Sequence, residues 1–351
     1  MNFSFSDDQL QFQASVRNYF TNEVTPERIR ELWTRTDGRC EQLWGELVEL
    51  GLPAFCVPEA QGGMGLSELD FVLIAQEAGY AGLPEPLVDT AMVAVPLLTA
   101  LDEAHAELRD GWLARVASGA ARLAVAEPGA ALVADAHVAG LLLLAHGDEV
   151  HAVPRAAVQL VRNESVDPSR QLFSVEWTPD ATTRVATAEQ GRALWAATRN
   201  RAALGVAAQL LGLAKRMVDL AVDYSFERKQ FGKPVGSFQA VKHLMANAAV
   251  QIEFAKGPLY HAAYAVAHQQ PLAAQRVAHA KLACAEAALL AARNAMQVHG
   301  AMGYTWEVDL HLFMKRAWAL DKAWGDAAQH KAAIRAALFG GAIQPGAGHT
   351  F

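Results

Sequence analysis

The stretch RKQFGKPVGSFQAVKH, residues 228–243, decides how the C-terminal half of this chain folds. An apolar stripe with helical spacing precedes it, from Leu204 to Val222, and a second long helical pattern follows it. Lys233-Pro234-Val235-Gly236 breaks the helical pattern, and Ser237 is placed to cap the helix that comes next. The stretch therefore predicts two long antiparallel helices joined by a short turn.

The same stretch contains side chains that suit a nucleotide. Arg228 can pair with a pyrophosphate through its forked guanidinium, and Phe231 can stack on adenine. The amides of Gln230 and Gln239 can hold ribose or base edges. The alternative is an ordinary helical hairpin with Phe231 and Phe238 in its core, and spacing alone favours that alternative.

A second pattern, QVHGAMGYTWE, occupies residues 297–307. The small residues Gly300, Ala301 and Gly303 let the backbone approach a ligand closely. Exposed backbone amides in such a turn suit an anion such as pyrophosphate. The alternative is a simple helix C-cap at Gly300, so this pattern is also weak when it is taken alone.

The chain changes character twice along its length. It has helical patterns from Ser6 to about Ser118, with Ser6 and Gln9 forming a capping-box pair. Short apolar runs separated by Gly, Asp, Pro and Asn then predict strands, with Gly147-Asp148 as a hairpin turn. From Ala188 onwards four helical segments with short connections predict an antiparallel bundle.

Composition limits the classes of partner and compartment. The formal net charge of −7 over 351 residues gives no reason to expect a nucleic-acid partner. The three cysteines, Cys40, Cys56 and Cys284, match no metal spacing and leave one over if two pair, which favours reduced thiols in a cytoplasmic protein. The N-terminus has no signal-peptide pattern, and the most apolar stretch, Val138–Ala145, is too short to span a membrane.

Several common active-site motifs are missing from the sequence. Residues 232–237 lack the spacing of a phosphate-binding P-loop, and no G-x-S-x-G or H-E-x-x-H motif occurs. The twelve histidines are scattered, and each is more often a solvated or core residue than a ligand. We therefore predict no metal site.

Together, the two patterns resemble the acyl-CoA dehydrogenase family. The family pattern is Arg-x-x-Phe-Gly followed by Phe-Gln, and then Gln-x-x-Gly-Gly-x-Gly-Tyr-Thr; residues 228–239 and 297–305 are similar to it. The resemblance implies a mainly α fold with a small β-domain. Its parts would be an N-terminal helical domain (1–120), a middle β-domain (121–188) and a C-terminal four-helix bundle (189–351).

The resemblance also implies a cofactor and a reaction. Members use FAD to dehydrogenate the α and β carbons of an acyl-CoA thioester, with a carboxylate as base and an electron-transferring flavoprotein as acceptor. In the family, a neighbouring subunit supplies part of the grip on each FAD. The resemblance assigns that role here to Arg228, Gln230, Phe231, Gln239, Gln297, Gly300 and Ala301, with Ala301 in place of the usual second glycine.

The chain departs from the family where the catalytic base is expected. By the resemblance, Trp324 stands at the usual glutamate position, and an indole has no accessible basic site. At the alternative position used by some members stand Ala202 and Ala203. Asp326 lies two residues out, which turns its side chain towards the far face of a helix. In the β region only Glu127-Pro128 remains of the flavin-contacting element.

These departures predict an accessory subunit that completes the FAD site of an unlike, glutamate-bearing partner. Two-subunit enzymes of this kind occur in the family for bulky steroid side-chain thioesters. Two alternatives remain open: a self-sufficient homo-oligomeric dehydrogenase with a relocated base, and a helical interaction protein that has lost the flavin. The resemblance does not identify the acyl chain.

Overall fold

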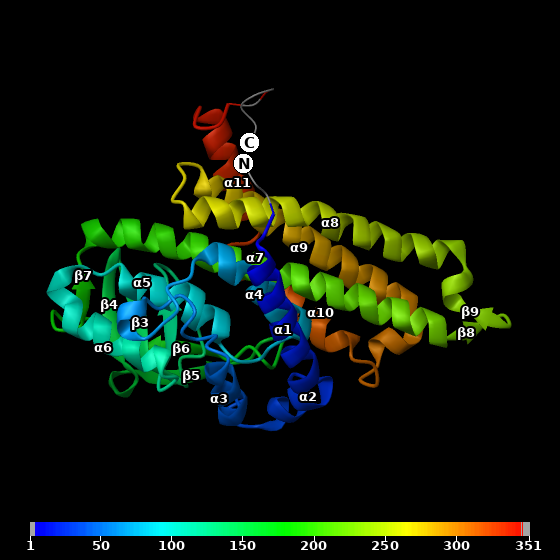
Figure 1. The fold of residues 1–351 in the computed structure, drawn as a ribbon, viewed down its shortest axis with the longest axis horizontal. Helices are drawn as coiled ribbons and strands as arrows, with labels where there is room; N and C mark the ends of the chain where they lie inside the picture. The colour runs from blue at the N-terminus through cyan, green and yellow to red at the C-terminus, as the bar shows by residue number, and fades with distance from the viewer. Residues whose placement is uncertain (1–3, 345, 347–351) are drawn as a thin grey trace.

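The computed structural model describes residues 4–344 and 346, and it consists of helices at both ends of the chain with strands between them. Figure 1 shows the strands at one side, next to helices α5 and α6, and the long helices extending to the other side. The predicted fold class, mainly α with a small β region, is confirmed.

The N-terminal part contains six helices. Ser6 caps the first of them as predicted, because its hydroxyl accepts from the Gln9 amide while the Gln9 side chain accepts from the Ser6 backbone. The helices are α1 (Asp7–Glu23), α2 (Pro26–Thr34), α3 (Glu41–Glu49), α4 (Glu68–Ala81), α5 (Val95–Thr99), which follows a π-helical segment at Asp89–Ala94, and α6 (Ala106–Ala117).

The strands of the middle region form two sheets that pack against each other. A four-stranded sheet has the order β1-β3-β4-β7, with β1 and β3 parallel, and a three-stranded sheet has the order β2-β6-β5. Gly147 takes a φ of +58° in the predicted β3–β4 hairpin turn. The strands are β1 (Arg122–Ala126), β2 (Val133–Ala134), β3 (Ala139–His146), β4 (Glu149–Pro154), β5 (Gln159–Asn163), β6 (Leu172–Glu176) and β7 (Arg184–Ala186).

The C-terminal part is built on three long helices. Helix α7 (Ala188–Glu227) is followed by the short hairpin β8 (Lys229–Gln230) and β9 (Lys233–Pro234), and then by α8 (Gln239–Ala267) and α9 (Ala273–His299). The prediction that Ser237 caps α8 is wrong. Phe238 is the N-cap residue, and the Ser237 hydroxyl donates to the Pro234 carbonyl instead (2.7 Å) because Ser237 lies in a 3₁₀ turn.

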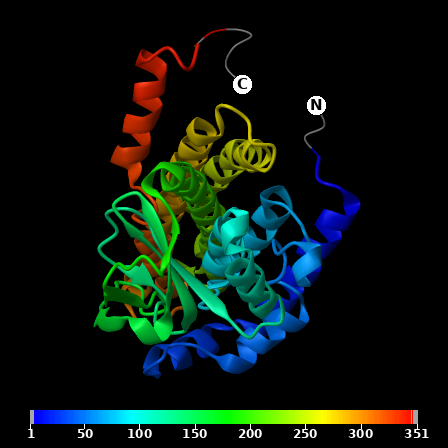
Figure 2. The same cartoon turned by 90° about the vertical axis from the view of Figure 1, so that its left-hand side faces the viewer.

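The fourth helix of the bundle is shorter than the other three and is interrupted. Helix α10 (Leu310–Asp321) ends before a turn that contains Trp324, and α11 (Ala327–Phe339) then leaves the body of the protein. Figures 1 and 2 both show α11 projecting away from the rest of the molecule. Among the described residues, no helix is long and apolar enough to cross a membrane.

Helices α4 and α7 cross at a point where their backbones touch. A methyl group added at Gly79 of α4 would lie 2.1 Å from the Gln209 carbonyl oxygen of α7. A methyl group added at Gly212 of α7 would lie 1.9 Å from the Gln76 carbonyl oxygen of α4. The two glycines therefore fix how the N-terminal helices sit on the bundle, and this contact forms one wall of the cleft described below.

We expect Gly79→Ala to lower the free energy of unfolding by about 2–3 kcal/mol, because the methyl group meets backbone that cannot move aside without separating α4 from α7. Gly111→Ala is the matched control. Gly111 is exposed in α6 with nothing within 4 Å of the added methyl group, so this change should stabilise by about 0.5–1 kcal/mol. Urea unfolding of both variants measures the difference, and equal effects would contradict the close crossing.

Candidate functional site

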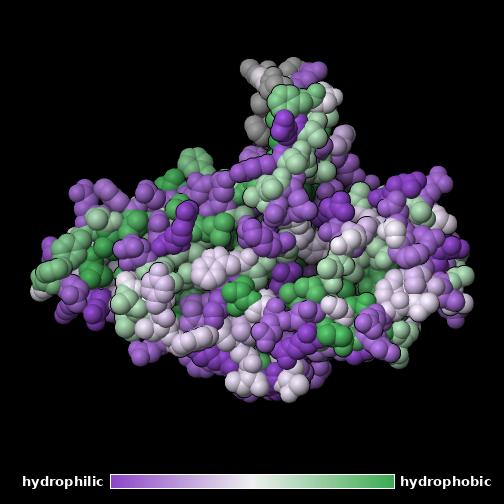
Figure 3. Space-filling model, turned by 180° about the vertical axis from the view of Figure 1, so that it is seen from behind, coloured by the Kyte–Doolittle hydropathy of each residue, from purple (hydrophilic) through white to green (hydrophobic). Residues whose placement is uncertain are grey.

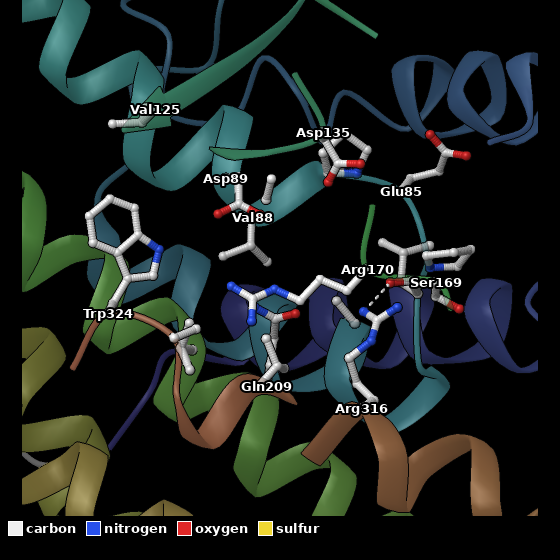
Figure 4. A pocket seen from close by; sticks show the side chains of 18 of the residues that line it. Glu85, Val88, Asp89, Val125, Asp135, Ser169, Arg170, Gln209, Arg316 and Trp324 are labelled. Atoms are coloured by element: carbon white, nitrogen blue, oxygen red, sulfur yellow. Dashed lines mark hydrogen bonds between the residues drawn. The ribbon is translucent and has the colours of Figure 1, made fainter. Parts of the chain in front are cut away.

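A cleft of about 220 Å³ lies where the three parts of the chain meet. The segment between α4 and α5 supplies Glu85 from a loop and Asp89 from the start of the π-helical segment, the β region supplies Asp135 and Arg170, and the bundle supplies Gln209, Arg316 and Trp324 (Figure 4). Pockets that take drug-sized ligands are larger, at about 300–1,000 Å³. This space is therefore small for a flavin ring together with an acyl thioester.

Ion pairs hold the rim and floor of the cleft. The guanidinium of Arg39 pairs with Asp135, and that of Arg316 pairs with Asp167 and also donates to the Leu83 carbonyl (3.0 Å). Glu85 accepts from the Cys40 amide (2.8 Å). Burial of such groups is tolerated only when they are paired, because a lone buried charge is poorly solvated. These charged groups therefore each have a partner within the protein, although the buried Nε atom of Arg39 has none.

Asp89 and Arg170 face each other in the middle of the cleft. Figure 4 shows Arg170 extending between Asp89 and Gln209 towards Trp324. Burial, followed by repulsion from Asp135, raises the pKa of Asp89 to about 6, while Arg170 opposes that shift. Asp89 is thus a carboxyl group that changes charge near neutral pH. Sequence analysis missed it because it follows Pro84 and Pro86 in a segment with no recognisable motif.

Neither of the two base positions has a basic side chain. Trp324 lines the cleft from a turn in which its own φ is +53°, and it packs against the buried cluster that contains Ala202. Ala203 is buried as well. Asp326 caps α11, and its bond to the Gln329 backbone lowers the pKa of its carboxyl group. Within the described residues, these positions offer no group that removes a proton at neutral pH.

The turn that holds Trp324 is fixed by a buried lysine on α9. The ammonium of Lys281 donates to the carbonyls of Leu320 (3.3 Å), Asp321 (3.0 Å) and Gly325 (3.3 Å). Two of these carbonyls belong to the last turn of α10, and the third, that of Gly325, belongs to the turn before α11. Lys281 therefore holds Trp324 in its place beside the cleft.

Titration of Lys281 should appear in the stability of the protein. Burial lowers its pKa from 10.5 to about 8, so the folded state releases this proton before the unfolded state does. Stability relative to Lys281→Met should therefore rise between pH 8 and 10, by about 1.4 kcal/mol per pH unit at most. Urea unfolding of both proteins at pH 7, 8, 9 and 10 measures this difference, and a constant value would refute the depressed pKa.

The residues assigned to FAD by the resemblance all lie at the other end of the bundle. Each of the seven is exposed: Arg228, Gln230, Phe231, Gln239, Gln297, Gly300 and Ala301. The helices next to the two patterns contact each other there, because the ring of Tyr224 stacks on that of His299 at 4.3 Å and the Asn294 amide donates to the Leu244 carbonyl (2.7 Å). The structure therefore brings both patterns to one surface.

This surface is open to solvent. Gly300 adopts φ 59° and ψ −136°, which suits glycine, and a methyl group added there would meet nothing within 4 Å. Phe231 is 90% exposed with a φ of +52° at the tip of the β8–β9 hairpin. A positive φ is uncommon for a residue other than glycine. Figure 3 shows apolar side chains among polar ones at this end of the molecule, on the left of that view.

The surface and the cleft are separated along one helix. Gln209 of α7 lines the cleft, and Arg228 ends the same helix 19 residues later. At 1.5 Å per residue, the two positions are about 28 Å apart. The exposed surface offers a guanidinium, side-chain amides and an aromatic ring, which are groups that can pair with a pyrophosphate and stack on an adenine. The chain's own cleft, of about 220 Å³ and crossed by Arg170, is small for a flavin ring.

The family is shown by two domain matches and by relatives in sequence. Residues 6–120 match the acyl-CoA dehydrogenase N-terminal domain, and residues 189–339 match the C-terminal domain. Acyl-CoA dehydrogenase IpdE2 of Mycobacterium tuberculosis is 32% identical over 314 residues, which are 89% of this chain and 91% of that protein. Acyl-CoA dehydrogenase FadE34 of the same organism is 32% identical over 296 residues, 77% of this chain and 38% of that protein.

Solved structures share the fold. The ChsE4–ChsE5 complex of Mycobacterium tuberculosis contains a chain that aligns with a TM-score of 0.85 at 24% identity, covering 99% of this chain and 100% of that one. A glutaryl-coenzyme A dehydrogenase in complex with glutaryl-CoA aligns with a TM-score of 0.86 at 22% identity, covering 97% of each chain. The predicted resemblance is confirmed, and the chain belongs to the acyl-CoA dehydrogenase family, whose members are FAD-dependent oxidoreductases or subunits of one.

Proposed function

We propose that this chain is the accessory subunit of a heteromeric acyl-CoA dehydrogenase and completes the FAD site of a glutamate-bearing partner. One observation supports the proposal: the residues around Arg228 that resemble the family's FAD-binding pattern are exposed, while the chain's own cleft has Trp324 at the base position and Arg170 across its centre. A subunit of this kind helps to bind the cofactor but does not act as the base.

Residues of this chain would act by binding and orientation. The guanidinium of Arg228 would pair with the pyrophosphate, and the Gln230 amide would donate to the same region. Phe231 would pack beside the adenine, with Gln239 nearby, while Gln297 and the backbone at Gly300 and Ala301 would line the adenosine end. When bound, the flavin supplies the hydride acceptor for α,β-dehydrogenation of the thioester.

The partner would supply the proton-removing carboxylate. In this chain the corresponding space holds an indole and a small apolar cluster that includes Ala202, and neither accepts a proton. We further propose an acyl-CoA substrate, an electron-transferring flavoprotein as acceptor and a cytoplasmic location. The assignment to the steroid type rests on the proposal that this chain is an accessory subunit. The residues of the chain do not identify the acyl group of the substrate.

One observation favours the self-sufficient alternative. Asp89 lies in the chain's own cleft, and its pKa of about 6 suits a general base near neutral pH. Arg170 faces it, however, and would have to move before a substrate could reach it. In that alternative Asp89, rather than Asp326, is the relocated base.

Colour distinguishes these functions. The chain should be colourless when it is purified alone and should become yellow when it is produced together with a longer, glutamate-bearing relative. A yellow protein whose flavin is reduced when acyl-CoA is added to the chain alone would establish the self-sufficient enzyme, and Asp89→Asn should then abolish reduction. A chain that stays colourless with every such relative would leave only the flavin-free interaction protein.

A further inference from the structure

Three potential ligand side chains share one face of the β3–β4 hairpin. His146 lies directly opposite Glu149 across the turn, and His151 follows Glu149 by two residues on the same strand. Cross-strand partners and residues two apart on a strand point to the same face of a sheet. The hairpin therefore brings two imidazoles and a carboxylate together, although no sequence motif predicts that these side chains are neighbours.

The donor atoms are close enough for one ion to contact all three. The Glu149 Oε2 atom lies 3.6 Å from His146 Nδ1 and 3.3 Å from His151 Nε2, and the three donors all lie within 4.8 Å of one another. Tetrahedral Zn²⁺ with bonds of about 2.0–2.1 Å places its ligands about 3.4 Å apart. Small side-chain rotations would bring the three donors to that spacing.

The hydrogen bonds of His151 determine which of its ring nitrogens carries the lone pair that faces the Glu149 carboxylate. The Thr183 hydroxyl donates its one proton to the Asp180 carbonyl (3.0 Å), so its oxygen must accept from His151 Nδ1 (3.0 Å). In the neutral imidazole Nε2 then carries a lone pair, and that lone pair faces Glu149 Oε2. Two lone pairs at this distance repel each other unless a proton or a metal ion lies between them.

We propose that His146, Glu149 and His151 form a site for a divalent transition-metal cation, with Zn²⁺ as the probe. The contact with Thr183 fixes the tautomer and ring orientation of His151 in the way that outer partners of metal ligands do. Arg184 donates to the other carboxylate oxygen, Oε1 (3.0 Å), and so leaves Oε2 available. Two imidazoles favour zinc, copper or nickel over calcium or magnesium.

The three ligands differ in how exposed they are. His151 is 1% exposed and meets the ring of Trp177 edge to face, with 5.1 Å between the ring centroids, whereas the His146 side chain is 61% exposed and leaves a fourth position open to water. None of the three ligands lines the cleft. A bound ion would join the β3–β4 turn to β4, next to its pairing with β7. This proposal departs from the expectation of no metal site, which considered spacing along the chain and not across a hairpin turn.

The test uses the whole chain, produced without a histidine tag and treated with a chelator. Zn²⁺ titration by calorimetry should show one saturable site, together with a Zn²⁺-dependent rise in the melting temperature. His146→Ala changes an exposed side chain, and it should weaken binding at least tenfold and remove the thermal shift. His243→Ala, which alters an exposed histidine on α8, should leave both unchanged.

Thr183→Val is the second variant, because it removes the acceptor that orients His151 without touching a ligand. It should weaken Zn²⁺ binding less than His146→Ala does. The proposal is overturned if no saturable binding occurs, or if His146→Ala and His243→Ala bind Zn²⁺ equally well, which would place the ion at scattered surface histidines.

Discussion

Replacing Arg228 by alanine is expected to lower the flavin content of the heteromeric complex at least tenfold. Under the proposed function, this guanidinium is the cation that pairs with the pyrophosphate, and it is exposed and free to reach a neighbouring subunit. A charge-assisted hydrogen bond of this kind contributes about 1.5–3 kcal/mol, which corresponds to roughly 10- to 150-fold in affinity. The measurement is the ratio of flavin absorbance to protein after gel filtration of the complex.

Arg192→Ala is the matched control for that variant. Arg192 is an exposed arginine at the other end of the same helix, 36 residues before Arg228 and so about 54 Å away. The control should keep full flavin content. Both complexes should elute at the same volume, because neither arginine is needed for folding. Normal flavin in the Arg228→Ala complex would remove the assigned role of this residue.

Arg316→Met should cause the largest loss of stability, about 3–5 kcal/mol in the free energy of unfolding. Arg316 is buried at the cleft, and it pairs with Asp167, whose side chain is 1% exposed. The substitution leaves a buried carboxylate without its cation and the Leu83 carbonyl without its donor. Urea unfolding of the purified chain measures the effect.

Two further variants serve as controls for the effect of Arg316→Met. Arg192→Met removes a surface cation that pairs with Asp148 at 3.4 Å, and it should cost less than about 1 kcal/mol. The double variant Asp167→Asn/Arg316→Met should recover part of the loss, because the uncompensated charge is gone. If Arg316→Met costs no more than Arg192→Met, the cleft charges do not stabilise the fold.

The periodic parts of the sequence predicted the helices and strands well. Capping at Ser6, the Gly147 turn and the long helices each follow from local chemistry, and the structure has them. The error at Ser237 also has a local cause. Ser237 lies in a 3₁₀ turn, where its hydroxyl donates to the Pro234 carbonyl and is not available to cap α8.

Part of the candidate site could also be predicted from the sequence, and part could not. The Arg228 and Gly300 surface was found because its residues form two contiguous patterns. The cleft was not found, because Asp89, Asp135, Arg170 and Arg316 come from four separate elements and only the fold brings them together. Spacing along the chain also gave no sign of the tertiary contact between Lys281 and the Trp324 turn. Whether the seven assigned residues bind FAD stays a prediction.

The distance along α7 between cleft and hairpin has a consequence for stoichiometry. A stiff helix cannot fold back, so one chain cannot use its own hairpin to serve its own cleft. In a pairing of this chain with a catalytic relative, the relative's hairpin would then meet a cleft that Arg170 and Trp324 occupy. Such an assembly would carry one flavin for every two polypeptides, half the ratio of an enzyme made of identical subunits.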